Sequence, residues 1–310
     1  MAFLKPVLVT GAGGCIGSWV LARLVADDVE VVAFDLSDDK RRPALVMDEA
    51  ALGRVRWLTG DIGDGDTIER IVAENDIGAI IHLAALQVPF CRDDPAAGAR
   101  ANVVGSVNIF QAARQHGVRQ LSYASSVAVR GIGDNPWLAT LYGAYKNCNE
   151  DCAAVYWQDW QVPSVGIRPG TVYGVARDQG MTSLPTVAML HAAAGQPYTV
   201  PFTGSVAFVY AAEAADAFIQ AALAARDGAP VFDLNGVGAT VDEALDVVRR
   251  LLPEAEVDSE GDALPFPADL SDEPLREYVG GYDVYTLEQG IEETVGRFGD
   301  LLERGLVSVG

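Results

Sequence analysis

Basic side chains are scarce in this sequence. Its 310 residues contain 22 lysines and arginines and three histidines, against 43 aspartates and glutamates, and the formal net charge is −21 at pH 7. A protein of this charge repels other polyanions, so we exclude nucleic acid and an anionic membrane surface as partners. Only three of the basic residues are lysines, Lys5, Lys40 and Lys146, which makes the surroundings of each lysine informative.

Cysteines and long apolar runs are also few. Cys15, Cys91, Cys148 and Cys152 are too scattered for a disulfide framework. Cys148 and Cys152 lie one helical turn apart without a histidine or further cysteine nearby, so we expect reduced thiols and no metal site. No window reaches the roughly 18 unbroken apolar residues of a membrane helix. The first residues lack a signal-peptide pattern, and we therefore expect a soluble, cytoplasmic protein.

Short apolar segments alternate with helical patterns along the first half of the chain. We expect strands at 6–10, 29–34, 55–61, 78–85, 119–126 and 162–170, and helices at 15–28, 64–75, 94–117 and around 141–160. This alternation predicts an α/β fold with a doubly wound parallel sheet covered by helices on both faces.

The alternation weakens after Gly174 and predicts a smaller, mixed C-terminal lobe. We expect helices at 181–197, 211–225 and 286–305, the last with Thr286 as its N-cap, strands at 205–210 and 230–236, and mostly loop at 253–283.

A glycine-rich turn joins the first expected strand to the first expected helix. The segment VLVTGAGGCIG places Gly11, Gly14 and Gly17 in a GxxGxxG spacing. The first glycine permits a tight turn, the second lets a pyrophosphate approach the backbone, and the third lets helix and strand pack closely. This strand–turn–helix context predicts a dinucleotide site.

Asp35 ends the second expected strand, about 20 residues beyond the glycine-rich turn. A carboxylate there accepts hydrogen bonds from the adenosine ribose and repels a 2′-phosphate, which favours NAD over NADP. Arg41 and Arg42 follow shortly afterwards and favour NADP instead, since arginines can bind that phosphate. The aspartate occupies the discriminating position, and we expect NAD.

The segment YGAYK places Lys146 four residues after Tyr142. Residues at i and i+4 share a helix face, and a nearby ammonium favours the phenolate and lowers the pKa of a tyrosine. Such a tyrosine can exchange protons near working pH. Taken alone, the spacing is more typical of a tyrosine and a lysine on a solvated helix face, and the other motifs decide between the two interpretations.

Together these motifs resemble an extended short-chain dehydrogenase/reductase, the group that includes NAD-dependent epimerases and dehydratases. The resemblance covers residues 5–175 well. The matching segments, in chain order, are TGAGGCIG (10–17), Asp35, GDI (60–62), HLAA (82–85), NVVGSVN (102–108), SYASSVAVRG (122–131), YGAYK (142–146), RPGTVYG (168–174) and, more loosely, TLEQGI (286–291).

The resemblance implies a role for each matching residue. Tyr142 would be the general acid/base, Ser126 would hydrogen-bond the reacting oxygen, and Lys146 would hold the nicotinamide ribose. Residues 1–175 would form the NAD-binding Rossmann domain, and 176–310 a smaller substrate-binding lobe with which the chain interleaves. The implied cofactor-binding residues are Gly11, Gly14, Cys15, Ile16, Gly17, Asp35, Asp61, Ile62, Leu83, Ala84, Ala85, Asn102, Tyr142, Lys146, Pro169, Thr171 and Val172.

Two positions need a choice. Ser125 and Ser126 are adjacent, and successive strand side chains face opposite sides, so only one can readily reach the substrate. The resemblance favours Ser126. His82 ends a buried strand, where a histidine is more often a core residue than a catalyst, and we assign it no chemistry.

The implied chemistry is hydride transfer between a secondary alcohol and NAD. Nucleotide-sugar epimerases usually carry an arginine before a C-terminal strand, but the corresponding SVAFVYAAE (205–213) has none. We therefore expect a dehydrogenase of a small sugar, sugar acid or hydroxy acid, and hence a part in carbohydrate metabolism. The alternative is an NAD-dependent sugar or nucleotide-sugar epimerase/dehydratase with transient hydride transfer. An NAD-binding regulator without turnover is a third possibility, against which the intact Ser126, Tyr142 and Lys146 argue.

Candidate substrate residues lie near these motifs. Gln87 and Ser126 can hydrogen-bond hydroxyls, and Arg177 is either a carboxylate anchor or a surface arginine. Tyr173, with Phe90 and Met181, is expected to wall the pocket or to belong to the core. The resemblance also implies a homodimer built from the helices at 94–116 and 141–160.

Overall fold

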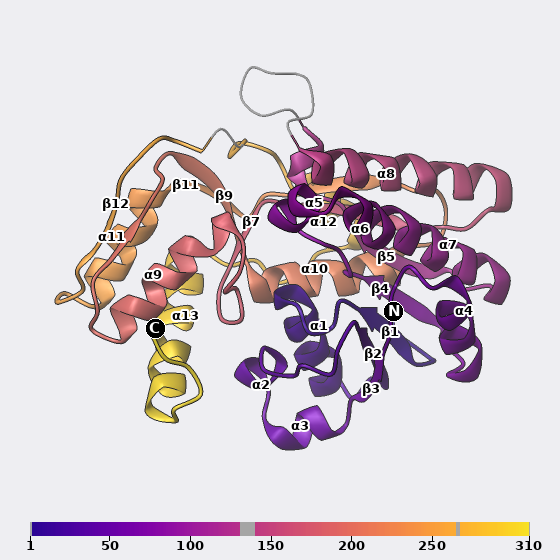
Figure 1. Cartoon of the computed structure of the whole chain (residues 1–310), viewed down its shortest axis with the longest axis horizontal. Helices are drawn as coiled ribbons and strands as arrows, with labels where there is room; N and C mark the ends of the chain where they lie inside the picture. Colours follow the sequence, from indigo (N-terminus) through magenta and orange to yellow (C-terminus); the bar gives the residue numbers. More distant parts are fainter. Residues whose placement is uncertain (1, 131–139, 265–266, 310) are drawn as a thin grey trace.

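The centre of the molecule is a seven-stranded parallel sheet (Figure 1). The structure, a computed structural model, describes residues 2–130, 140–264 and 267–309. The strand order is β10-β6-β5-β4-β1-β2-β3. The strands are β1 (Val7–Thr10), β2 (Val31–Asp35), β3 (Arg56–Thr59), β4 (Ala79–His82), β5 (Gln120–Ala124), β6 (Val165–Pro169) and β10 (Val231–Leu234). The predicted doubly wound α/β fold is confirmed.

Both faces of this sheet are covered, which explains why its strands read as continuous apolar runs. All four residues of β1 are buried. Its side chains alternate between two cores: Val7 and Val9 pack in one, and Leu8 packs in the other. Helices α1 (Cys15–Ala26) and α10 (Ala211–Ala224) cover the first face, and α4 (Gly65–Glu74), α7 (Gly105–His116) and α8 (Leu141–Trp160) cover the second.

The expected helix at 94–117 is present but changes its winding. It consists of α6 (Pro95–Ala99), a π-helical turn η1 (Arg100–Val104) and α7. Helix α8 carries the YGAYK motif in its first turns. Thr140 caps the start of this helix, because its side chain accepts a hydrogen bond from the Gly143 amide.

The C-terminal part of the chain builds a second, smaller layer beside the sheet (Figure 1). Strand β9 lies between β7, which is parallel to it, and β11, which is antiparallel, and β8 pairs with β12. The elements of this layer are β7 (Thr171–Tyr173), α9 (Leu184–Ala193), β8 (Tyr198–Val200), β9 (Ser205–Tyr210), β11 (Val237–Thr240), α11 (Val241–Leu251), β12 (Val257–Ser259) and α13 (Leu287–Glu303). Helix α12 (Glu273–Val279) packs instead against α10 and β10.

The sequence patterns missed several elements of this layer and of the loops. Helix α11 was not predicted, although the capping box of Thr240 and Glu243 at its start can be recognised in the sequence. Strand β12 and helix α12 lie inside the segment expected to be mostly loop. The other short elements are α2 (Pro43–Val46), α3 (Glu49–Gly53), α5 (Val88–Asp93), η2 (Val127–Val129) and η3 (Met181–Ser183).

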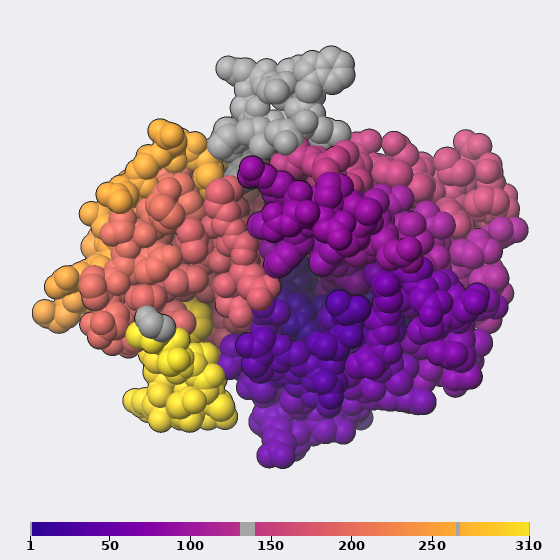
Figure 2. All heavy atoms as spheres, in the orientation of Figure 1, coloured from indigo at the N-terminus to yellow at the C-terminus, as the bar shows by residue number. Residues whose placement is uncertain are grey.

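The strand order reverses beside β1, since β2 lies on one side of it and β4 on the other. In open parallel sheets, ligands bind at the carboxyl ends of the strands at such a switch point. Figure 2 shows the surface hollowed there, between the indigo and purple N-terminal part and the salmon C-terminal part. None of the helices in the described ranges is long and apolar enough to cross a bilayer.

The predicted N-cap of the last helix is confirmed and gives a stability test. The Thr286 hydroxyl accepts a hydrogen bond from the Gln289 amide at 3.2 Å. We expect Thr286→Ala to lower the free energy of unfolding by about 1 kcal/mol, because this amide loses its acceptor. Urea unfolding followed by circular dichroism measures the change. Thr286→Ser keeps the hydroxyl and is the control; an equal loss in both variants would contradict the assignment.

Candidate active site

A cavity of about 1070 Å³ opens at the carboxyl ends of the central strands. Its lining combines the turn after β1 with the ends of β2, β4, β5 and β6 and the loop that follows β7. Its volume is at the upper end of ligand pockets, which commonly measure about 300–1,000 Å³. The cavity therefore has room for an extended ligand such as a dinucleotide together with a smaller one.

The glycine-rich turn forms one wall of this cavity, and two of its glycines are required by close contacts. A Cβ on Gly11, whose φ is +69°, would lie 2.6 Å from the Ala84 amide nitrogen, and a Cβ on Gly17 would lie 2.3 Å from the Gly11 oxygen. A Cβ on Gly14 would meet only the Gly11 oxygen within 4 Å, so its other sides are open. Helix α1 starts at Cys15, directly after this open position, and so presents its N-terminal amides to an anion in the cavity.

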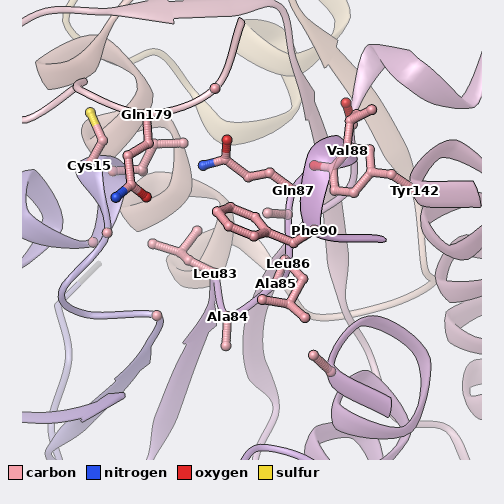
Figure 3. A pocket seen from close by; sticks show the side chains of 18 of the residues that line it. Cys15, Leu83, Ala84, Ala85, Leu86, Gln87, Val88, Phe90, Tyr142 and Gln179 are labelled. Atoms are coloured by element: carbon pink, nitrogen blue, oxygen red, sulfur yellow. The ribbon is translucent and has the colours of Figure 1, made fainter. Parts of the chain in front are cut away.

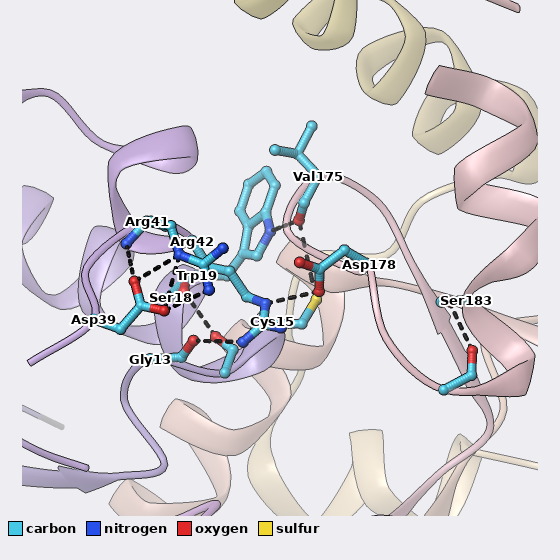
Figure 4. A network of polar contacts seen from close by, with 12 residues as sticks. Gly13, Cys15, Ser18, Trp19, Asp39, Arg41, Arg42, Val175, Asp178 and Ser183 are labelled. Carbon is cyan, nitrogen blue, oxygen red and sulfur yellow. Dashed lines mark hydrogen bonds and ion pairs between the residues drawn. The ribbon is translucent and has the colours of Figure 1, made fainter. Parts of the chain in front are cut away.

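Asp35 lines the cavity and is fixed by the same turn. Its two carboxylate oxygens accept hydrogen bonds from the Gly13 amide at 2.8 Å and the Leu36 amide at 2.7 Å. Arg41 and Arg42, which could have favoured NADP, each form an ion pair with a carboxylate (Figure 4). Arg41 binds Asp39, and Arg42 donates to Asp178 at 2.7 Å. Because these charges are already paired, the environment of Asp35 favours NAD.

Most of the residues expected to contact the cofactor share the cavity wall. They are Gly11, Gly14, Cys15, Ile16, Gly17, Asp35, Asp61, Ile62, Leu83, Ala84, Ala85, Tyr142, Lys146, Pro169, Thr171 and Val172.

Asn102 and Tyr173 do not line the cavity, so direct contact of Asn102 with the cofactor stays a prediction, and of the two alternatives for Tyr173 the core applies. Asn102 is fully buried and donates to the Leu86 carbonyl at 3.0 Å, so it braces the loop after β4 from behind. Tyr173 is buried in the C-terminal lobe and packs edge-to-face on Phe208. A Cβ on Gly290 would lie 2.0 Å from the Tyr173 hydroxyl. Successive strand side chains alternate, so Val172 faces the cavity and Tyr173 faces the core.

Tyr142 and Lys146 lie on one face of α8 and line the cavity together, as the four-residue spacing predicts. The Lys146 nitrogen is 5.6 Å from the centroid of the Tyr142 ring and donates to the Ala124 carbonyl at 2.6 Å. Lys146 is 2% exposed, so the interpretation of this pair as a solvated helix face does not apply.

Burial dominates the protonation of both groups. It lowers the pKa of the Lys146 ammonium to about 8 and raises the pKa of the Tyr142 phenol. The hydrogen bond with Ser126 and the charge of Arg177 lower the tyrosine pKa against this effect. The sequence predicted a lowering by Lys146 instead, but in this structure the ammonium is bound to a backbone carbonyl at the end of β5.

The two adjacent serines have different surroundings. Ser125 is 2% exposed and its hydroxyl donates to the Glu150 carboxylate. Ser126 lines the cavity, interacts with Tyr142, and caps η2 by accepting from the Ala128 amide. Ser126 is therefore the serine available to a substrate. Gly131, the last residue of this motif, lies outside the described residues.

A partly buried ion-pair network that the sequence analysis missed lies behind these serines. Glu150, one helical turn after Lys146, binds the Arg168 guanidinium through both carboxylate oxygens. Arg168 also approaches Asp233 on β10 at 3.8 Å, and Asp233 accepts from Arg130 at 2.5 Å. The only signal in the sequence was that Glu150 follows Lys146 by four residues. The network fixes α8 against β5, β6 and β10.

His82 is a core residue, as expected. Its ring nitrogens lie 2.7 Å from the Thr10 hydroxyl and 3.1 Å from the Ser106 hydroxyl, and burial lowers its pKa to about 3. The four cysteines are free thiols. Within the described ranges, no three His, Cys, Asp or Glu side chains are grouped in a way that could hold a metal ion.

The candidate substrate residues Gln87 and Arg177 line the cavity with Phe90 and Met181. In the view of Figure 3, the Gln87 amide lies between Cys15 on one side and Tyr142 on the other. Arg177 is half-buried and donates to the Thr182 hydroxyl at 2.9 Å. It is thus part of the cavity wall, and its role as a carboxylate anchor stays a prediction.

Comparison with known proteins agrees with this arrangement. The family model of the "NAD dependent epimerase/dehydratase family" matches residues 7–235. The UDP-glucose 4-epimerase of Mycolicibacterium smegmatis is 30% identical over 311 aligned positions, which cover 93% of this chain and 96% of that protein. A solved structure of the UDP-glucose 4-epimerase of Thermus thermophilus in complex with NAD superposes with a TM-score of 0.79 at 26% identity, covering 97% and 100% of the two chains. L-threonine dehydrogenase from Clostridium difficile shares the fold, with a TM-score of 0.83 at 19% identity and coverage of 99% and 100%.

The sheet, the glycine-rich turn and the serine, tyrosine and lysine at its edge define an extended short-chain dehydrogenase/reductase, a class of NAD-dependent epimerases and dehydrogenases. Within that class, the chain belongs to the NAD-dependent epimerase/dehydratase family, and its cofactor is NAD.

The serine pair gives a test of the site. We expect Ser126→Ala to reduce kcat by about 100- to 1000-fold, because the reacting oxygen loses a hydrogen-bond partner, and to leave the Kd for NAD unchanged. Ser125→Ala should instead lower the free energy of unfolding by about 1–3 kcal/mol, because the buried Glu150 loses a donor. Steady-state kinetics and urea unfolding of both variants distinguish these roles, and the reverse pattern would contradict them.

Proposed function

We propose that this enzyme oxidises a secondary alcohol of a small polyhydroxylated substrate, with NAD as the hydride acceptor. The observation that carries the proposal is the extent of the cavity. Its lining in the described ranges runs from Gly11 to Thr182, and no described residue beyond Thr182 contributes. Apart from Arg177, the described part of the C-terminal lobe offers no cation there for the diphosphate of a nucleotide sugar, and a small substrate fits the remaining space better.

The cavity fits NAD on its own features. The open side of Gly14 and the start of α1 at Cys15 would receive the pyrophosphate, and Asp35 would accept hydrogen bonds from the adenosine ribose. Lys146 would hold the nicotinamide ribose. When bound, NAD supplies a hydride acceptor.

The side chains at the other end of the cavity handle the proton. Tyr142 in its phenolate form takes the hydroxyl proton of the alcohol as the alcohol carbon gives up a hydride, and Ser126 holds the same oxygen by a hydrogen bond. The products are a carbonyl compound, NADH and a proton that passes to solvent. Glu150 and Arg168 keep α8 in place during this exchange.

The second candidate function is epimerisation. It is favoured by the 30% identity to a UDP-glucose 4-epimerase over 93% of the chain. In that reaction the hydride returns to the other face of the carbonyl, so NADH does not accumulate. The two functions share Ser126, Tyr142 and Lys146 and differ in the substrate and in the fate of the hydride.

We further propose the division of labour within the chain. Residues 1–175 would bind NAD, and residues 176–310 would complete the substrate site, chiefly through the segment 177–182 that lines the cavity. A role in carbohydrate metabolism in the cytoplasm follows from a small polyhydroxylated substrate and free cysteines.

The reaction type is tested by a panel of sugars, sugar acids and hydroxy acids with NAD. Tyr142→Phe should lower kcat by about 100- to 10,000-fold, because proton transfer from the alcohol is lost, with an unchanged Kd for NAD. Nicotinamide absorbance measures turnover, and quenching of tryptophan fluorescence measures NAD binding. NADH released in proportion to product identifies a dehydrogenase. Epimer formation without net NADH would replace the proposed dehydrogenase by the second candidate, an epimerase. Unimpaired turnover by Tyr142→Phe would contradict the proposed role of the tyrosine.

The helices at 94–116 and 141–160 suggest a homodimer. They pack side by side and expose the apolar Val104 and Val155, which are 44% and 47% exposed. We expect Val155→Glu to shift the protein from dimer to monomer, because a carboxylate would be buried without a partner. Light scattering after size-exclusion chromatography measures the mass. Val284→Glu, at an equally exposed valine in the C-terminal lobe, is the control; a wild-type monomer would overturn the proposal.

A further inference from the structure

Arg177 is held in a strained segment that crosses the start of α1. The Val175 carbonyl accepts a hydrogen bond from the Trp19 indole at 2.9 Å (Figure 4), and the Arg177 amide donates to the Gly174 carbonyl at 3.0 Å. Between them, Ala176 is buried and has a φ of 74°, a conformation that non-glycine residues rarely adopt. Such strain persists where the surrounding structure fixes it, and here it sets the direction of the next side chain.

The Arg177 guanidinium is not neutralised by the described part of the chain. No carboxylate of the described residues lies within 4.0 Å of it, although the protein has 43 acidic residues. Its neighbour Asp178 is bound to Arg42 instead. Of its five N–H groups, one binds the Thr182 hydroxyl, and the Nε atom is buried without a partner. A partly buried cation in this state favours an anion beside it.

The other cations that line the cavity are different. Arg42 is paired with Asp178, Lys146 is bound to the Ala124 carbonyl, and Arg92 and Arg100 are exposed to solvent. Arg177 is therefore the one half-buried lining cation in the described ranges that lacks both a carboxylate and full solvation.

The surroundings of Arg177 would place an anion bound to it near the reacting end of the cavity. A Cβ on Gly180 would lie 3.6 Å from an Arg177 terminal nitrogen and 2.5 Å from the Gln87 amide oxygen, so the two side chains are neighbours. The charge of Arg177 also acts on the Tyr142 phenol. An anion held here would share the cavity with the alcohol that Tyr142 deprotonates, because Arg177 and Tyr142 both line it.

We propose that Arg177, with Thr182 and Gln87 beside it, binds a carboxylate of the substrate, so that the substrate is a polyhydroxy acid. The planar guanidinium matches a carboxylate in geometry and charge, while Thr182 and Gln87 supply polar groups for a neighbouring hydroxyl. This inference rests on the proposed oxidation of a small alcohol and narrows its substrate to the acids.

The pyrophosphate of NAD is the other possible source of an anion, because Arg177 also acts on Cys15 at the start of α1. That anion already has the amides of the helix start. The experiment therefore measures substrate and cofactor separately.

The test compares four- to six-carbon aldonates with the corresponding alditols, in which a hydroxymethyl group replaces the carboxylate. The wild type should release NADH from an aldonate with a KM at least about 10-fold below that for its alditol. Arg177→Gln should raise the aldonate KM by about 10- to 100-fold, as expected for a lost hydrogen bond to a charged group, and Arg177→Lys should restore part of this loss. The alditol KM and the Kd for NAD should change by less than about 2-fold, since neither contains the carboxylate.

Arg92→Gln is the matched control, because it removes an exposed cation from the same cavity. A loss equal to that of Arg177→Gln would show a general effect of charge and overturn the assignment. A raised Kd for NAD with an unchanged aldonate KM would assign Arg177 to the pyrophosphate and also overturn it. NADH released from alditols but not from aldonates would refute the carboxylate site and leave the proposed oxidation intact.

Direct binding separates this inference from the proposed function. Calorimetric titration of the NAD-loaded protein with D-gluconate and with sorbitol measures affinity without turnover. Tighter binding of gluconate that Arg177→Gln abolishes would support the carboxylate site even if the panel showed epimerisation. Equal binding of both compounds would overturn it, whatever the reaction.

Discussion

The close contact between the glycine-rich turn and β4 is the constraint on which the site depends. Gly11 lies against the Leu83–Ala84 backbone, and Gly17 lies against Gly11 itself. These contacts leave no room for a Cβ, and they bring the start of α1 to the switch point of the sheet. One backbone arrangement therefore supplies the anion-binding helix end, fixes Asp35 through the Gly13 amide, and opens the cavity between β1 and β4.

A second set of contacts fixes the helix that carries the proposed catalytic side chains, Tyr142 and Lys146. The Glu150–Arg168 pair joins α8 to β6, and Ser125 ties the end of β5 to the same carboxylate. Removing one partner of this partly buried pair is destabilising, because the other charge is left uncompensated. The network thus fixes the helix that carries Tyr142 and Lys146, while Ser126 lies outside the network and lines the cavity.

The segment after β7 connects the two halves of the molecule and closes one side of the cavity. It is anchored to α1 through Val175 and to the Arg42 side chain through Asp178. Asp178 neutralises Arg42, which lies beside the proposed ribose site. The charge at that site is therefore set by a loop much later in the chain. The same loop presents Arg177 to the substrate end, so the cofactor and substrate regions share one short support.

The sequence by itself determined the sheet, the glycine-rich turn, the place of Asp35 at the end of its strand and the pairing of Tyr142 with Lys146. These features follow from local rules: strand and helix periodicity, glycine spacing, and the i, i+4 geometry of a helix. Only the tertiary structure decided that Tyr173 faces a core, that Ser125 belongs to an ion-pair network, and that Arg177 lines the cavity. Each of those outcomes depends on contacts between segments distant in sequence, and side-chain direction there is set by packing, which local patterns do not encode.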